Sequence, residues 1–246
     1  VVNIDDPYGL RLAKQIDIKT YRASTDAIEI KDEIFTGSSI IWRDLPIELQ
    51  ISGRFNIENA LLAASTCLLM GIDENQIVNG LEAAEPVPGR FEVIDGYEGA
   101  PTVIVDYSHT PAGIENVLQA VRKISPEVGL TIVFGCGGNR DSSKRPKMAR
   151  SAEKHADRVI LTSDNPRYED PLKIIDQTMS GFINPNSIIV EEDREAAIQV
   201  AIQSSGPDEV IVIAGKGAET TQEICGKVKP FDDRVIAEAV LQGVKG

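Results

Sequence analysis

The feature that most constrains the fold is a regular alternation of apolar, β-branched runs with helical stretches over the second part of the chain. The apolar runs cover residues 102–105, 131–134, 159–161, 188–190 and 210–213. The helical stretches between them cover residues 111–123, 146–156, 171–182 and 194–203. Strands that are apolar throughout and are joined by helices form parallel sheets that are covered on both faces. The alternation therefore predicts an α/β domain with a doubly wound, mostly parallel sheet.

The first part of the chain has a different pattern. Short alternating stretches at residues 16–23, 27–35, 39–42 and 47–51 predict strands joined as hairpins. Two helices should follow, the first over residues 56–70 and the second beginning after Asp73, which can cap it. The Pro-rich stretch 85–89 interrupts the pattern and is the candidate linker. We therefore predict one domain over residues 1–87 and a second over residues 88–246.

The chain is acidic, with 38 Asp and Glu residues against 25 Lys and Arg residues and a formal net charge of −13. Such a surface repels phosphate backbones and anionic membranes, which predicts no nucleic-acid partner and no membrane partner. The three cysteines are widely spaced and form no CxxC pair, so we expect reduced thiols in the cytoplasm. The chain opens without Met on what reads as a strand end, so we expect a piece of a longer polypeptide.

A polar loop follows each of the apolar runs. These loops cover residues 106–111, 135–141, 163–167, 191–194 and 215–219. Ligands of doubly wound sheets bind beyond the carboxyl ends of the strands. Turns favour Gly, Asn, Asp and Pro in any protein, but five such loops, three of them with Arg, favour a shared binding rim.

Two of these loops resemble known motifs without matching them. Gly135-x-Gly137 begins like a dinucleotide fingerprint, but Arg140 stands where the third Gly belongs, which excludes a nicotinamide site. Arg140 would instead offer a fork for a carboxylate. The sequence around Lys216 is not a P-loop, because no Ser or Thr follows the lysine and no Gly stands five residues before it.

Other loop residues leave a functional and a structural interpretation open. Asn165 and Arg167, held apart by Pro166, could present an amide and a guanidinium to an amino acid, or could belong to a solvated turn. Glu219 could pair with a substrate ammonium or favour the start of a helix. His109 could orient a substrate or lie at a helix start. No cluster of His and Cys predicts a metal site.

Taken together, the motifs resemble those of the Mur ligase family, and most closely its MurE branch. The resemblance covers essentially the whole chain, through residues 2–9, 53–60, 87–92, 105–111, 135–141, 164–167 and 215–219. The CGGNRD and DNPR sequences are the parts most specific to MurE. Ala218 stands where many relatives have His, and we expect a local effect only. The resemblance implies a Rossmann-like C-terminal domain that binds the amino acid, preceded by the C-terminal portion of the central ATP-binding domain.

The resemblance also implies roles for individual residues. The nucleotide would be contacted by Asn56, Asn59, Arg90 and Asp106, with Arg90 at the phosphate and Asp106 at the ribose. The incoming amino acid would be held by Arg140, Asp164, Asn165, Pro166, Arg167, Gly215 and Glu219. His109 is a candidate for orienting the substrate. The family's P-loop, magnesium ligands and carbamylated lysine precede the first residue, so no catalytic residue and no metal ligand is identified here.

The implied reaction belongs to peptidoglycan synthesis. ATP, with Mg²⁺, phosphorylates the γ-carboxylate of UDP-N-acetylmuramoyl-L-alanyl-D-glutamate, and the amine of the incoming amino acid attacks the acyl phosphate. Arg167 favours meso-diaminopimelate, whose second carboxylate a guanidinium can bind bidentately. L-Lysine lacks that carboxylate and would leave the guanidinium unpaired. We expect a monomer, and we expect this chain alone to be inactive.

Three alternatives remain open at this point. The first is a MurE enzyme that adds L-lysine. The second is another ligase of the superfamily, such as a folylpolyglutamate synthetase, which would not require DNPR beside CGGNRD. The third is an amino-acid-binding module without catalytic activity.

Overall fold

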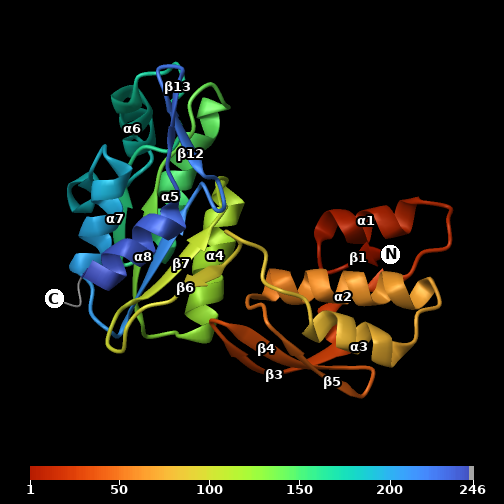
Figure 1. Cartoon of the computed structure of the whole chain (residues 1–246). Helices are drawn as coiled ribbons and strands as arrows, with labels where there is room; N and C mark the ends of the chain where they lie inside the picture. Colours follow the sequence, from red (N-terminus) through yellow and green to blue (C-terminus); the bar gives the residue numbers. More distant parts are fainter. Residues whose placement is uncertain (244–246) are drawn as a thin grey trace. The chain divides into compact units, whose positions relative to one another are not determined.

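The structure is a computed structural model that describes residues 1–243 (Figure 1). It separates into two compact units, Val1–Pro86 and Val87–Gly246, so the division lies within the Pro-rich stretch. None of the helices in the described part of the chain is both long enough and apolar enough to cross a membrane.

The first unit combines two small sheets with two packed helices. Its elements are β1 (Val2–Asn3), α1 (Pro7–Gln15), β2 (Arg22–Ala23), η1 (Thr25–Ala27), β3 (Ile28–Ile34), β4 (Gly37–Trp42), β5 (Leu45–Leu49), α2 (Arg54–Leu69) and α3 (Glu74–Glu82). Strands β3, β4 and β5 form an antiparallel sheet. Trp42 and Ile47 of this sheet pack with Ile57 of α2 and Ile77 of α3 in one core. The predicted hairpin strands at 27–35, 39–42 and 47–51 are therefore confirmed.

The prediction of a hairpin strand over residues 16–23 is wrong. Within residues 16–23 only Arg22–Ala23 forms a strand, and it pairs in parallel with Val2–Asn3. Helix α1 connects the two strands, with Asp6 as its N-cap and Pro7 in its first turn. A parallel pair joined through a helix gives no local turn signal, which is why alternation alone misassigned it.

The second unit is built on a six-stranded sheet in the order β10-β9-β8-β11-β7-β6. The strands are β6 (Glu92–Ile94), β7 (Thr102–Asp106), β8 (Gly129–Phe134), β9 (Arg158–Leu161), β10 (Ile189–Val190) and β11 (Glu209–Ala214). All neighbours pair in parallel except β6, which runs antiparallel to β7 at one edge. The predicted doubly wound, mostly parallel sheet is confirmed, and β6 is an addition that the sequence did not reveal.

Helices cover both faces of this sheet (Figure 1). They are α4 (Pro111–Ile124), η2 (Ser142–Lys144), α5 (Arg145–His155), α6 (Pro171–Met179), η3 (Pro185–Ser187), α7 (Arg194–Gln203) and α8 (Asp233–Gly243). Helices α7 and α8 share one core with Val103, Val133 and Ile211. Helix α4 contacts β11 and α5, and α5 contacts β9 and α6. Alternate strand residues such as Ile104 and Ile132 point away from the first core and are fully buried on this second face.

A β-hairpin of β12 (Thr221–Ile224) and β13 (Lys227–Pro230) follows the last parallel strand. Its two-residue turn has positive φ at both positions, 51° at Cys225 and 71° at Gly226, as tight hairpin turns require. The backbone N–H of Arg167 donates to the Glu223 carbonyl at 3.0 Å. The hairpin therefore supports the loop that carries Arg167.

Candidate functional site

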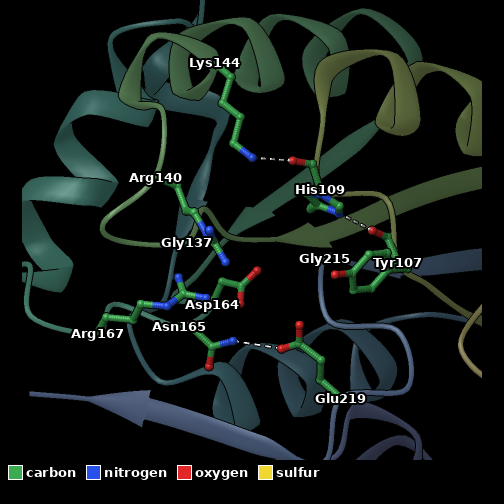
Figure 2. Close-up of a pocket in the computed structure, with 10 residues that line it drawn as sticks. All are labelled: Tyr107, His109, Gly137, Arg140, Lys144, Asp164, Asn165, Arg167, Gly215 and Glu219. Atoms are coloured by element: carbon green, nitrogen blue, oxygen red, sulfur yellow. Dashed lines mark hydrogen bonds between the residues drawn. The ribbon is translucent and has the colours of Figure 1, made fainter. Parts of the chain in front are cut away.

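A cavity of about 380 Å³ opens where β7, β8, β9 and β11 end (Figure 2). It is lined by Tyr107, His109, Gly137, Arg140, Lys144, Asp164, Asn165, Arg167, Gly215 and Glu219. The loops that the sequence placed after four strands therefore meet in one site, as parallel strands dictate. The structure brings together all of the predicted amino-acid-binding residues except Pro166, whose carbonyl accepts the Glu169 N–H at 3.0 Å.

The loop after β10 does not join this rim, so the prediction of five convergent loops is wrong in that part. Arg194 begins α7 and is fully buried, where its guanidinium binds Asp233 through Nε to Oδ1 at 2.8 Å and Nη2 to Oδ2 at 2.7 Å. It also donates to the carbonyls of Ser163 and Ala214. Strand β10 is the outermost strand of the sheet, which places its loop beyond the cavity.

Basic and acidic groups face one another in the cavity. Figure 2 shows Arg140, Arg167 and Asp164 gathered on one side, with Asn165 joined to Glu219 beside them. The Arg140 side chain is exposed and makes no hydrogen bond or ion pair within residues 1–243. Arg167 donates through Nη1 to the Gly138 carbonyl at 2.8 Å, and its Nε lies 3.8 Å from Glu223 Oε2. Such a set can hold a molecule that carries both carboxylates and ammonium groups.

Asp164 is a buried carboxylate at this cavity. Burial raises its pKa, because the charged form loses hydration. Glu219 and Asp233 add to the rise, and the positive charges of Arg194 and Lys216 oppose it. A ligand ammonium beside Asp164 would therefore satisfy a carboxylate that is poorly solvated without it.

Asn165 and Glu219 are joined through a buried lysine. Asn165 Nδ2 donates to Glu219 Oε2 at 2.8 Å. Lys216 Nζ donates to Asn165 Oδ1 and to Glu219 Oε2, both at 3.2 Å, and to the Thr221 carbonyl at 2.7 Å. The Lys216 side chain is fully buried. The carboxylate and the amide are therefore held in a fixed relation within the cavity wall.

A second buried cation, Arg145, holds the two loops that supply the arginines. Its guanidinium binds Glu169 in a forked pair, with Nη1 to Oε2 at 2.9 Å and Nη2 to Oε1 at 3.0 Å. Nη2 also donates to the Gly137 carbonyl at 3.1 Å. Glu169 in turn accepts the backbone N–H of Asn139. The loop after β8 and the loop after β9 are therefore locked to each other.

The residues predicted to contact nucleotide in this unit lie around the end of β7. The Arg90 guanidinium is exposed and stacks over the Tyr107 ring at 4.5 Å from its centroid. Asp106 is buried, and its carboxylate accepts the N–H of Phe91 and that of Ser108, each at 2.8 Å. Asp106 thus ties the Arg90 loop to the strand, and Arg90 presents its charge outward.

His109 and Lys144 form the far side of the cavity. His109 Nδ1 donates to the Tyr107 carbonyl at 2.9 Å, which leaves Nε2 as the free ring nitrogen. Lys144 Nζ donates to the His109 carbonyl at 3.0 Å. The sequence placed His109 here as a candidate for orienting a substrate, and the structure places it in the cavity wall.

The Arg90 loop and the Lys216 loop touch directly. A methyl group added at Gly89 would overlap the backbone of Gly217 and Ala218. A methyl group at Gly217 would lie 2.7 Å from the Gly89 carbonyl oxygen. The two loops therefore approach as closely as backbones can, and only glycine fits on both sides.

In the first unit, Asn56 and Asn59 lie in the first turns of α2. Asn56 Nδ2 donates to the Ser52 carbonyl at 2.7 Å, whereas Asn59 is exposed. Near the start of the same helix, Arg54 Nη2 donates to Thr25 Oγ1 at 2.6 Å and lies 3.9 Å from Asp5 Oδ2. Asp5 also accepts from Ser24 and Thr25.

Cys136 lies in the loop after β8 but packs inward, with its sulfur 3.7 Å from Met148 Sδ. Burial raises the pKa of its thiol to about 11. At pH 8 it should therefore stay protonated and escape alkylation by iodoacetamide, whereas exposed Cys225 should react. Mass spectrometry of tryptic peptides would test this, with the denatured chain as control. Labelling of Cys136 in the folded chain at the rate of Cys225 would contradict it.

Several residues of the site were not identified from the sequence. These are Tyr107, Lys144, Arg145, Lys216 and the partner of Arg194, Asp233. Lys216 carried one signal, since it stands between two glycines. Among residues 1–243, no group of three His, Cys, Asp or Glu side chains could hold a metal ion.

The chain is similar in sequence to proteins of one known family. Residues 89–217 match the family model described as Mur ligase, glutamate ligase domain. The chain is 41% identical, over 98% of its length, to UDP-N-acetylmuramoyl-L-alanyl-D-glutamate–2,6-diaminopimelate ligase of Prochlorococcus marinus. It is 40% identical to the enzyme of that name from Clostridium tetani, also over 98%. It spans about half the length of these relatives, 51% and 52%.

The chain is also similar to solved structures of ligases. A structure of UDP-N-acetylmuramoyl-L-alanyl-D-glutamate–2,6-diaminopimelate ligase matches with a TM-score of 0.66 and 30% identity, covering 99% of this chain and 53% of that one. Folylpolyglutamate synthase from Thermotoga maritima matches with a TM-score of 0.59 and 23% identity, covering 85% of this chain and 49% of that one. The second match shows a shared fold.

Proposed function

The chain belongs to the Mur ligase family, and on that premise we propose that it is part of an ATP-dependent ligase that adds meso-diaminopimelate to UDP-N-acetylmuramoyl-L-alanyl-D-glutamate. Relatives of that name align with nearly the whole chain at about 40% identity. The single observation that best supports the substrate is the cavity in which Arg140 and Arg167 face Asp164 and Glu219 (Figure 2). The product would serve peptidoglycan synthesis.

In this proposal, the cavity binds the diamino acid through both of its charge types. Arg140 and Arg167 bind a carboxylate, since a guanidinium matches that group in geometry and charge. Glu219 and Asp164 accept hydrogen bonds from an ammonium. Gly215 leaves the space beside Asp164 open, because a methyl group there would lie 2.9 Å from Asp164 Oδ2. L-Lysine would fill the same space but leave the arginines without a carboxylate, which disfavours it.

The contribution of these residues to the reaction is positional. ATP would supply the phosphoryl group that activates the acceptor carboxylate. Arg90 is free to meet a phosphate, because its guanidinium is exposed and stacks over the Tyr107 ring. Asp106 would hold the Arg90 loop and offer a remaining lone pair to the ribose. Asn56 and Asn59 would contact the nucleotide from α2. Holding the amine near the activated carboxylate turns a bimolecular step into an effectively unimolecular one.

The test is ligation by the enzyme encoded by the complete reading frame that contains this chain. With the UDP-linked dipeptide and ATP, we expect kcat/KM for meso-diaminopimelate to exceed that for L-lysine by about 100-fold, roughly the 3 kcal/mol that an unpaired charged group costs. The 246-residue chain assayed in the same way should release no ADP and form no product.

Three other outcomes of this assay would change the proposed function. A preference for L-lysine would keep a ligase but overturn the role given to the arginines. Binding of the amino acid without any ATP-dependent ligation by the complete enzyme would favour a non-catalytic binding module. Ligation by the 246-residue chain alone would contradict the expectation that further segments are needed.

A further inference from the structure

We propose that Lys216 is a positioning residue that determines which atoms of Asn165 and Glu219 face the diamino acid. The inference rests on the proposed function, because it concerns the same cavity. Lys216 does not line the cavity, and its side chain has no exposed surface. It acts through the two residues that do line it.

Hydrogen bonds to its side-chain oxygen fix the orientation of the Asn165 amide. Its Oδ1 accepts two hydrogen bonds, from Lys216 Nζ at 3.2 Å and from the Glu223 backbone N–H at 3.0 Å. An ammonium and a backbone N–H can only donate, so the oxygen must point toward them. The Nδ2 group is therefore turned toward Glu219 and the cavity, with one N–H donated to Glu219 and the other left for a ligand.

The Glu219 carboxylate is held through one of its two oxygens. Its Oε2 accepts from both Asn165 Nδ2, at 2.8 Å, and Lys216 Nζ, at 3.2 Å. Its Oε1 accepts no hydrogen bond from the described residues. Holding Oε2 in place leaves Oε1 as the acceptor for an ammonium. Asn165 and Glu219 together then present one donor and one acceptor side by side, which matches the carboxylate and the ammonium of a single amino-acid centre.

The backbone around Lys216 explains how a lysine reaches this place. Gly215 and Gly217 have φ of +121° and +53°, which other residues rarely adopt. The Glu219 N–H donates to the Lys216 carbonyl at 3.0 Å, so the segment turns sharply. The turn sends the Lys216 side chain inward, where Nζ lies 5.9 Å from the centre of the Phe231 ring. The ring and the Thr221 carbonyl complete the surroundings of the ammonium.

The experiment uses the complete enzyme and the variant Lys216→Met, which keeps a long side chain but loses the ammonium. We expect KM for meso-diaminopimelate to rise about tenfold, as the loss of a charge-assisted contact predicts. KM for ATP and for the UDP-linked dipeptide should change by less than about twofold, and kcat should fall less than KM rises. Lys229→Met is the matched control, because Lys229 Nζ lies over the same Phe231 ring, at 5.5 Å, but is exposed.

A second comparison separates positioning from a general structural role. In an enzyme that already carries Glu219→Gln, the added Lys216→Met change should raise KM for the diamino acid by a smaller factor than it does in the unaltered enzyme, because the charged Lys216–Glu219 contact is already lost and only the contact with Asn165 remains to be removed. Independent, multiplying effects would overturn the proposal. So would an equal rise in all three KM values, or no change in any of them.

Two further outcomes concern the folding of the Lys216 variants and the activity of the unaltered enzyme. If Lys216→Met does not fold, Lys216→Gln replaces it, because the amide retains an N–H donor without the charge. Failure of both variants to fold would mean that Lys216 maintains the fold, and would overturn the proposal. If the unaltered enzyme does not ligate meso-diaminopimelate, the proposed function fails, and that result is distinct from an unaltered enzyme that is active and a variant that behaves like it.

Discussion

Replacement of Arg167 by alanine in the complete enzyme is expected to lower kcat/KM for meso-diaminopimelate by about 100-fold and to leave the slow use of L-lysine nearly unchanged. The guanidinium is the group that would meet the second carboxylate, and lysine has none. Loss of its hydrogen bond to the Gly138 carbonyl, 2.8 Å long, would add a smaller effect on both substrates. Steady-state kinetics with each amino acid would measure the change.

The control for this prediction is Arg122→Ala. Arg122 lies in the last turn of α4 and pairs with Asp157 at 2.6 Å, just before β9 begins and so at the opposite end of the sheet strands from the cavity. It should leave the preference between the two amino acids unchanged. Arg167→Lys should lie between the wild-type and alanine enzymes, because it keeps the charge and loses the fork. An equal loss for both amino acids in Arg167→Ala would contradict the specificity role.

Removal of one member of the buried Arg194–Asp233 pair should give the largest loss of stability. Asp233→Ala is expected to lower the free energy of unfolding by about 3–5 kcal/mol, because it leaves a guanidinium with no exposed surface and no counter-charge bound to it. The pair also holds the Ser163 and Ala214 carbonyls through Arg194. Urea unfolding of the chain, followed by circular dichroism, would measure the loss.

The neighbouring pair Arg234–Asp232 is the matched control. It is 2.6 Å long but partly exposed, so Asp232→Ala should cost only about 1–2 kcal/mol, which covers the ion pair and the hydrogen bond that Asp232 accepts from the Arg234 backbone N–H. Replacement of both buried partners, Arg194→Met with Asp233→Leu, should recover part of the loss, since no unpaired charge remains while the Ser163 and Ala214 carbonyls lose their donor. If Asp233→Ala proved as mild as Asp232→Ala, the buried pair would not be shielded from water as the structure indicates.

The parallel sheet was predictable because its strands carry a signal that does not depend on distant partners. Apolar β-branched runs such as residues 131–134 and 210–213 are recognisable by themselves. The elements that were missed depend on context. Strand β6 has only three residues and forms by pairing with β7, and the strand Arg22–Ala23 exists because Val2–Asn3 lies beside it. The β12–β13 hairpin has Cys225 at a turn position that usually takes Asn or Asp.

The position of the cavity could be predicted from the sequence, but the buried side chains that support its walls could not. The position of a loop after a parallel strand indicates where its residues gather, and this brought Arg140, Asn165 and Glu219 together. Sequence position does not say which way a charged side chain turns. Arg140 reaches the cavity, whereas Arg194, in an equally polar loop, is buried in an ion pair. Arg145 and Lys216 read as ordinary surface cations until packing shows them to be buried.

The close approach of Gly89 and Gly217 has a consequence for how ATP and the diamino acid would influence each other's binding in the proposed ligase. The loop that presents Arg90 and the loop that anchors Glu219 cannot shift independently, because no space separates their backbones. Occupation of one loop by a phosphate would then bias the conformation of the other, and such an influence is reciprocal in free energy. In the proposed ligase, any change that ATP caused in the affinity for the diamino acid would be matched by an equal change that the diamino acid caused in the affinity for ATP. Gly89 and Gly217 would thus be the point at which the binding of one substrate influences the binding of the other.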